Sequence, residues 1–191
     1  MSDPDVALML AFANGQEDAF VQLYQRHRDR IVGFTRRMLG DQARAEEAAQ
    51  DVFLKLYRAR TSYEPRSRFS TFLYRIAANH CLNLQSRLDR KLVDRGRAFE
   101  PNAAPGGADQ HAALAQKRLR QLLSAALGRL PDRQRAALLL VHYEGLSYRE
   151  AADAIDVSEA AVKSLIHRAR AAMIAELEPL LADGAEVEHA L

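Results

Sequence analysis

Residues 145–158 read Gly-Leu-Ser-Tyr-Arg-Glu-Ala-Ala-Asp-Ala-Ile-Asp-Val-Ser, and they indicate how the second half of the chain folds. Ser147 and Glu150 have the S-x-x-E spacing of a capping box, which predicts that a short helix begins at Ser147. Residues 156–157 then form a turn, and Ser158 can cap a second helix. The first helix has a narrow face of small and apolar residues: Ala151, Ala152, Ala154 and Ile155.

The second helix combines a buried stripe with a basic surface. Its apolar residues recur at helical spacing: Val162, Leu165, Ile166, Ala169 and Met173. Two short helices across a tight turn, the second of them basic, form a helix-turn-helix. An ordinary helical hairpin would give the same pattern, but the capping box, the small-residue face and the second cap together favour the helix-turn-helix.

Outward from this motif, almost the whole chain reads as helix. One helix is predicted over about 113–127 and another from Leu130-Pro131-Asp132 to Tyr143, before Gly145. Apolar periodicity predicts further helices over about 20–38, 46–60 and 69–87. No segment alternates with period two for long enough to indicate a strand, so the fold class is all-α.

A linker divides these helices into two groups. Residues 94–112 contain two prolines and three glycines and have no apolar periodicity. We therefore expect two small helical domains joined by a flexible linker: an N-terminal bundle over 1–93 and a helix-turn-helix bundle over 113–181. Residues 182–191 would form an acidic tail.

The net charge of +2 over 191 residues conceals two basic blocks. Residues 26–97 carry 17 bases and 8 acids, and residues 113–170 carry 10 bases and 6 acids, whereas both ends of the chain are acidic. Two basic blocks suggest a polyanionic partner. An arginine-rich surface of the kind common in high-GC genomes is the alternative.

Several function classes find little support in the sequence. The longest apolar run, residues 136–141, is far shorter than the roughly 20 residues of a membrane span, and the acidic start does not resemble a signal peptide. The histidines form no metal-ligand spacing, and Gly106-Gly107 is not part of a P-loop. We expect a cytoplasmic protein that is not an enzyme and has no metal, no cofactor and no membrane contact. Three side chains are expected in the core: His27, His80 and Cys81.

Five segments resemble the extracytoplasmic-function sigma factors of bacterial RNA polymerase, members of the sigma-70 superfamily. Residues 67–79 resemble their promoter −10 segment and residues 45–57 their polymerase-binding helix. The −35-binding domain is matched by residues 130–136, 145–152 and 162–170. The match runs in order over about residues 15–180.

The resemblance implies a specificity subunit for core polymerase. Its first domain would bind the polymerase clamp and capture the unpaired −10 strand. Its second domain would read the −35 duplex and dock on the polymerase flap. Many members of the family are held inactive by an anti-sigma factor.

Capture of unpaired DNA needs flat side chains that stack on bases and amides that read base edges. Asn79 and Asn83 lie four residues apart, on one face of a helix, although a solvated face would look the same. Phe72 stands where the family usually has Trp. The resemblance assigns −10 binding to Tyr63, Arg66, Arg68, Phe69, Ser70, Phe72, Arg75, Asn79 and Asn83.

The two remaining surfaces are assigned in the same way. Polymerase contacts would come from Glu47, Gln50, Asp51, Phe53 and Leu54, although an acid such as Glu47 is also routine near a helix N-terminus. Lys and Arg suit phosphates and guanine edges, and the −35 contacts would come from Arg149, Ser158, Lys163, Ser164, His167, Arg168 and Arg170. Two positions depart from the family, since Leu165 replaces a frequent Arg and Ala161 a frequent Thr.

Two other functions compete with this interpretation. One is a stand-alone helix-turn-helix regulator of duplex DNA, and the other is an interaction protein that binds an anti-sigma factor or responds to phosphorylation. The first domain discriminates, because a lone duplex binder does not need an asparagine-bearing surface beside an acidic face.

Overall fold

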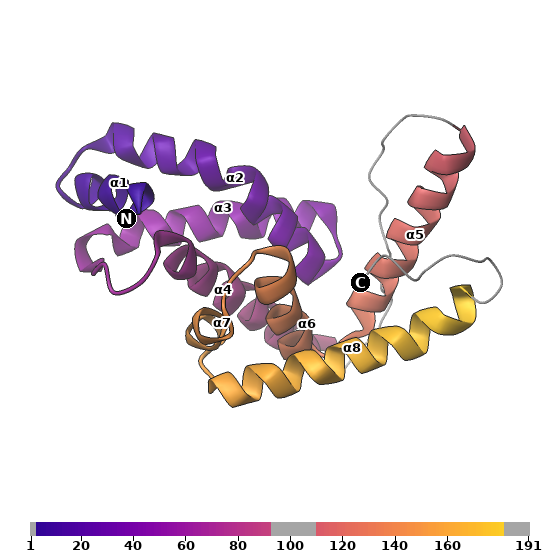
Figure 1. Ribbon diagram of the computed structural model, residues 1–191. Helices are drawn as coiled ribbons and strands as arrows, with labels where there is room; N and C mark the ends of the chain where they lie inside the picture. Colours follow the sequence, from indigo (N-terminus) through magenta and orange to yellow (C-terminus); the bar gives the residue numbers. More distant parts are fainter. Residues whose placement is uncertain (1–2, 93–109, 182–191) are drawn as a thin grey trace.

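The structure is a computed structural model that describes residues 3–92 and 110–181 (Figure 1). Within these ranges every regular element is a helix. The predicted tail and residues 94–109 of the predicted linker lie outside the described residues. The helices are α1 (Pro4–Ala13), α2 (Glu17–Leu39), α3 (Gln42–Arg58), the 3-10 turn η1 (Ala59–Ser62), α4 (Phe69–Leu92), α5 (Gln110–Arg129), α6 (Asp132–Leu138), the π-helical turn η2 (Leu139–Tyr143), α7 (Tyr148–Ile155) and α8 (Glu159–Leu181).

The apolar faces predicted for the first half are confirmed as its core. On α2 the buried positions include Leu23, Ile31, Phe34 and Met38, and on α3 they include Ala45, Ala48, Val52 and Leu56. Gly40 ends α2 with a φ of 75°, in the left-handed region that favours glycine. Asp41 then caps α3 by accepting a hydrogen bond from the Arg44 N–H at 2.7 Å.

Helix α1 was not among the predicted elements, although its start has a recognisable signature. Asp3 is the N-cap, Pro4 opens the helix and Asp5 lies in its first turn. Phe12 anchors the helix in the core, with its ring centroid 5.0 Å from that of Phe20 and 5.1 Å from that of Tyr57.

The helix-turn-helix is confirmed in the second half. The Glu150 N–H donates to the Ser147 hydroxyl at 3.2 Å, and the Ser147 N–H donates to the Glu150 carboxylate at 2.8 Å, which completes the capping box. Asp156 ends α7 in the left-handed conformation, with a φ of 54°. The Ser158 hydroxyl accepts a hydrogen bond from the Ala161 N–H at 3.1 Å and so caps α8.

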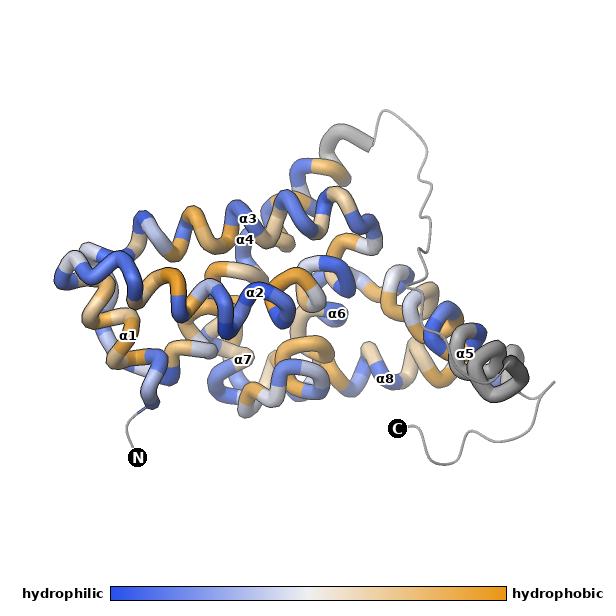
Figure 2. The backbone as a smooth tube through the Cα atoms, turned by 90° about the horizontal axis from the view of Figure 1, so that it is seen from above, coloured by the Kyte–Doolittle hydropathy of each residue, from blue (hydrophilic) through white to orange (hydrophobic). Residues whose placement is uncertain are grey.

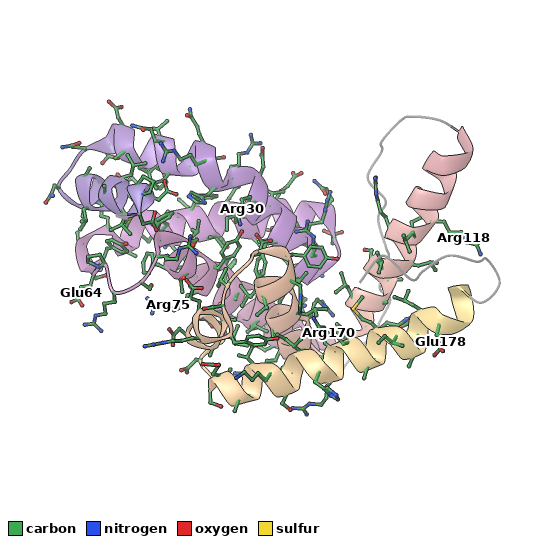
Figure 3. All side chains as sticks on the ribbon, in the orientation of Figure 1. Arg30, Glu64, Arg75, Arg118, Arg170 and Glu178 are labelled. Carbon is green, nitrogen blue, oxygen red and sulfur yellow. The ribbon has the colours of Figure 1, made fainter. Side chains whose placement is uncertain are left out.

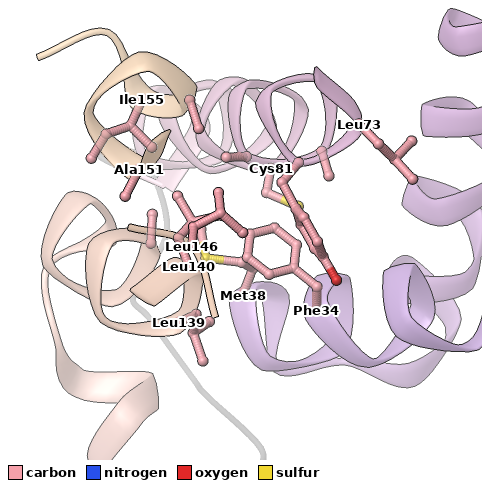
Figure 4. Packing of buried hydrophobic residues seen from close by; sticks show 14 of the residues in the cluster. Phe34, Met38, Leu73, Cys81, Leu139, Leu140, Leu146, Ala151 and Ile155 are labelled. Atoms are coloured by element: carbon pink, nitrogen blue, oxygen red, sulfur yellow. The ribbon is translucent and has the colours of Figure 1, made fainter. Parts of the chain in front are cut away.

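The two halves of the chain pack against each other and share one hydrophobic cluster. Helix α7 lies against α4, and α6 approaches α2 and α4 (Figure 1). Phe34 and Met38 from the first half meet Leu139, Leu140 and Leu146 from the second (Figure 4). Figure 2 shows the alternation of apolar and polar residues along the helices that makes this packing possible.

Candidate nucleic-acid interface

The predicted −10 surface lies on α4 and on the loop before it. Arg75, Asn79 and Asn83 are exposed on α4, whereas Ser70 and Phe72 are partly buried. Arginine and amide side chains on one exposed helix face can track phosphates and read base edges.

Aromatic packing supports this surface from below. Tyr63 is buried, and its ring centroid lies 4.9 Å from that of Phe72. The Arg75 guanidinium lies 5.3 Å from the centroid of the same Phe72 ring. Phe69 is completely buried in the core. Tyr63 and Phe69 therefore hold the surface in place rather than forming it, which differs from the roles the sequence assigned to them.

The loop leading into α4 is basic and exposed. Arg66 and Arg68 both face solvent, and Arg66 forms an ion pair with Glu64 at 2.5 Å. Because exposed ion pairs contribute little to stability, Arg66 can exchange Glu64 for a phosphate at small cost.

Helix α7 covers part of this surface. A hollow of about 310 Å³ between α4 and α7 is lined by basic residues on one side and acidic residues on the other. Figure 3 shows Arg75 beside α7. The Thr71 hydroxyl donates to the Glu150 carboxylate at 2.9 Å, which ties α4 to the start of the helix-turn-helix. The residues lining the hollow include Arg66, Phe72, Arg75, Asp153 and Asp156.

A carboxylate near η2 joins the two halves of the chain through several polar contacts. The side chain of Glu144 is only 5% exposed. It accepts a hydrogen bond from the Tyr74 hydroxyl, and its oxygens lie 3.5 Å from Arg30 and 3.6 Å from Arg37. Burial of Tyr74, followed by its hydrogen bond to Glu144, raises the pKa of this phenol well above its usual range.

Arg135 makes a second polar link between the halves. Its guanidinium is buried and donates to three carbonyls where α5 ends, those of Leu127, Gly128 and Leu130. It also donates to the carbonyl of Met38, where α2 ends. A cation at the carboxyl ends of α2 and α5 also complements the partial negative charge of these helix ends.

The predicted polymerase surface lies on α3. Glu47, Gln50 and Leu54 are exposed, and Leu54 keeps 52% of its surface accessible. Asp51 is half-exposed. Phe53 points the other way: it is buried, with its ring centroid 4.8 Å from that of Tyr24. The structure thus places Phe53 in the core rather than on the predicted surface.

His80 connects α3 with α4. The Lys55 ammonium donates to its Nδ1 at 2.7 Å, and a carboxylate oxygen of Asp51 lies 3.3 Å from Nε2. Because Nδ1 accepts, the ring is neutral and carries its proton on Nε2. Burial, followed by the nearby Lys55 charge, lowers the pKa of His80.

The lowered pKa of His80 predicts a loss of stability in mild acid. The folded chain binds this proton less readily than the unfolded chain, so the stabilisation is present above about pH 6.5 and is lost as the pH falls through the lowered pKa. The free energy of unfolding in urea should therefore fall more steeply between pH 7.5 and 5 for the wild type than for His80→Gln. His167→Gln, at an exposed histidine, is the matched control. Equal slopes for all three proteins would contradict the prediction.

Two further side chains expected in the core are also buried. His27 is 7% exposed and lies 2.8 Å from the Asp5 carboxylate. Cys81 is fully buried, and burial raises its pKa to about 12, so the thiol is unreactive. In the described parts of the chain, no three His, Cys, Asp or Glu side chains are grouped so that they could hold a metal ion.

The predicted −35 residues lie on α7, on α8 and in the turn between them. Arg149 and His167 are exposed, and Lys163 forms an ion pair with Glu159 at 3.0 Å. Arg168 donates to the Ser164 hydroxyl at 3.1 Å. Arg170 contacts the His142 ring at 2.9 Å. Ser158 is committed to capping α8, whereas Leu165 and Ala161 are partly buried.

Comparison with known proteins identifies the family. The profile of sigma-70 region 2 matches residues 23–91, and that of sigma-70 region 4 matches residues 120–173. The sigma factor CarQ of Myxococcus xanthus is 35% identical over 163 residues, covering 84% of this chain and 90% of CarQ. The extracytoplasmic-function sigma-E factor of Escherichia coli K12 is 32% identical, covering 93% of this chain and 96% of its own.

The chain belongs to the extracytoplasmic-function sigma factors. As a sigma factor it directs RNA polymerase to promoters, and its regions 2 and 4 bind core polymerase and promoter DNA. A stand-alone duplex regulator is not favoured, since the chain carries both sigma regions.

The sigma-factor fold extends over both halves. The structure of CnrH in complex with the cytosolic domain of CnrY aligns with a TM-score of 0.67 and 26% identity, covering 96% of this chain and all of that one. The sigma factor RpoE in complex with the anti-sigma factor NepR, from Bartonella quintana, aligns with a TM-score of 0.68 and 25% identity, covering 83% of this chain and 96% of its own. No helix in the described ranges has the length and hydropathy of a membrane span.

Proposed function

We propose that this sigma factor captures the melted −10 strand on the exposed face of α4. The observation that carries the proposal is the pair Asn79 and Asn83, exposed four residues apart within the segment that matches region 2. Arg75 lies on the same helix, and Arg66 and Arg68 stand in the loop before it, where they can hold the phosphates of an unpaired strand. Ser70 and Phe72 border this surface.

The polymerase contact would use the outer face of α3. Leu54 is a large apolar side chain with half of its surface in water, and Glu47 and Gln50 lie on earlier turns of the same helix. An apolar anchor beside acidic and amide groups suits a basic partner surface, because the charges set the register and the apolar group is desolvated. Asp51 would add a carboxylate held beside His80.

The −35 duplex would meet the helix-turn-helix. Lys163, His167 and Arg168 lie along the exposed side of α8, and Arg149 lies on α7. Lys163 and Arg168 now contact side chains on their own helix, and both contacts are exposed, so they can be exchanged for DNA phosphates.

Control by an anti-sigma factor is the second part of the proposal. Both similar solved structures contain a partner, the CnrY cytosolic domain in one and the anti-sigma factor NepR in the other. The likeness to CnrH, whose structure is a complex with CnrY, spans both halves of this chain. The packing of α7 on α4 would then belong to the form of the protein that an anti-sigma factor binds. We also propose that the chain divides into domains over 1–93 and 113–181. It would act in the cytoplasm and would have no catalytic activity of its own.

The test is run-off transcription with core polymerase. Adding the purified chain, free of any inhibitor, should yield transcripts from specific promoters, whereas core polymerase alone yields none. Proteins that co-purify from the native cell, added back, should suppress those transcripts. A mutant with Leu54→Asp should give no specific transcript because it no longer binds polymerase. Failure of the wild type to direct a promoter-specific start would overturn the proposal.

A further inference from the structure

The first turn of α4 takes its cap from a distant residue. The first N–H groups of a helix need acceptors that the helix itself cannot provide. The residue before α4 is Arg68, whose side chain has no acceptor. The Phe69 N–H donates instead to a carboxylate oxygen of Asp3, at 2.9 Å, across 66 residues of sequence.

The same carboxylate also caps α1. Its other oxygen accepts a hydrogen bond from the Asp5 N–H at 3.0 Å. One side chain thus ties the starts of two helices together. Both helix starts carry partial positive charge, so a carboxylate is favoured over a neutral group at this point.

Helix α1 is itself held on α2, so Asp3 has a fixed position. The Asp5 carboxylate lies 2.7 Å from Arg26 and 2.8 Å from His27, both on α2. Although burial opposes ionisation, the hydrogen bonds from Arg26 and His27 lower the pKa of Asp5. The His27 ring packs on Phe69 with 5.2 Å between centroids, so Phe69 is held through its side chain as well as its backbone.

The tied turn lies where the basic loop enters α4. Burial, followed by the charge of Asp3, raises the pKa of Tyr63 at the start of that loop. Tyr63 in turn packs on Phe72. Asp3 therefore holds the Phe69 end of the segment from Tyr63 to Phe69, which carries Arg66 and Arg68, and the packing of Tyr63 on Phe72 holds the other end.

We propose that Asp3 is a positioning residue for −10 capture, which holds the loop of residues 63–68 and the first turn of α4 in the geometry that receives the unpaired strand. This inference rests on the proposed role of α4. Asp3 does not touch the DNA; it fixes the groups that do. Arg68, the residue before α4, cannot replace it, because its side chain is a donor only.

Asp3→Ser separates the hydrogen bond that caps α1 from the hydrogen bond that caps α4. Serine is a strong N-cap, so Asp3→Ser keeps the cap of α1, but its short side chain does not reach Phe69. The measurement is the affinity of the reconstituted holoenzyme for a fork-junction probe with a single-stranded −10 segment. Loss of a hydrogen bond to a charged group should weaken capture by about ten- to 150-fold for Asp3→Ser. Affinity for core polymerase should not change, and amide exchange at Phe69 should become faster.

Two comparisons make the result decisive. Asp18→Ser, at an exposed acid on α2, should leave probe binding at the wild-type level. If Asn79→Ala weakens capture while Asp3→Ser does not, the positioning role is wrong and the proposed function stands. If Asp3→Ser weakens polymerase binding as much as probe binding, Asp3 supports the fold in general and the inference also fails. If the wild-type holoenzyme does not bind the probe, the assignment of α4 fails, and the inference with it.

Discussion

Replacing Glu144 with alanine should loosen the contact between the two halves of the chain. The variant leaves the Tyr74 hydroxyl buried without its acceptor, and it removes the carboxylate that faces Arg30 and Arg37. An orphaned buried hydroxyl costs about 1–3 kcal/mol, and we expect the free energy of unfolding in urea to fall by that amount. Arg30 is exposed and Arg37 is partly exposed, and both lie at least 3.5 Å from the carboxylate, so their lost ion pairs should add less than the orphaned hydroxyl.

The transcription yield of Glu144→Ala should not fall with its stability. Helix α7 covers part of the proposed −10 surface, and we expect promoter capture to improve when α7 leaves α4. Run-off transcription by Glu144→Ala should therefore be at least as efficient as by the wild type, despite the lower stability. Glu144→Gln, which keeps an acceptor for Tyr74, should lose less stability than the alanine variant. Glu178→Ala, at the exposed end of α8 (Figure 3), is the control. A transcript yield that falls in parallel with stability would refute this account.

Removing the amide of Asn79 should damage promoter opening while sparing the polymerase contact. A well-placed base contact is worth about 1–3 kcal/mol, so opening should slow by about 5- to 100-fold in Asn79→Ala. Asn79 is exposed on α4, whereas the proposed polymerase residues lie on α3, so affinity for core polymerase should stay unchanged. Permanganate reactivity of thymines in the −10 region measures opening, and fluorescence anisotropy measures polymerase binding.

Controls separate this role from a general loss of structure. Asn14→Ala changes another exposed asparagine, at the end of α1, and should open promoters at the wild-type rate. Leu54→Asp should show the reverse defect, with polymerase binding lost. An Asn79→Ala variant that loses both activities equally would show that the amide does not serve strand capture.

Local patterns predicted the helices well because their signals lie close together in sequence. The capping box at Ser147 and Glu150, the cap at Ser158 and the apolar stripes of α2 and α3 depend on residues three or four apart, and the structure confirms each of them. The start of α1 had an equally local signal in residues 3–5, but the prediction treated that segment only as an acidic end.

The remaining features depend on partners that are distant in sequence. Nothing near Glu144 indicates that its acceptor will meet Tyr74, 70 residues earlier. Nothing near Phe69 indicates that Asp3 will cap it. The misplacement of Phe53 has the same origin, because its burial depends on Tyr24 of another helix. Spacing along one helix defines its faces, but the identity of the neighbour on each face comes from tertiary packing.

The shared cluster of Phe34, Met38, Leu139, Leu140 and Leu146 has a consequence for synthesis on the ribosome. The first half of the chain is translated before the residues that cover its apolar face exist. Glu144 follows Tyr74 by 70 positions, and adding these residues at about 5–20 residues per second requires about 4–14 s. Throughout that interval the nascent chain presents an uncovered apolar strip, which a chaperone can bind before α6 and α7 emerge.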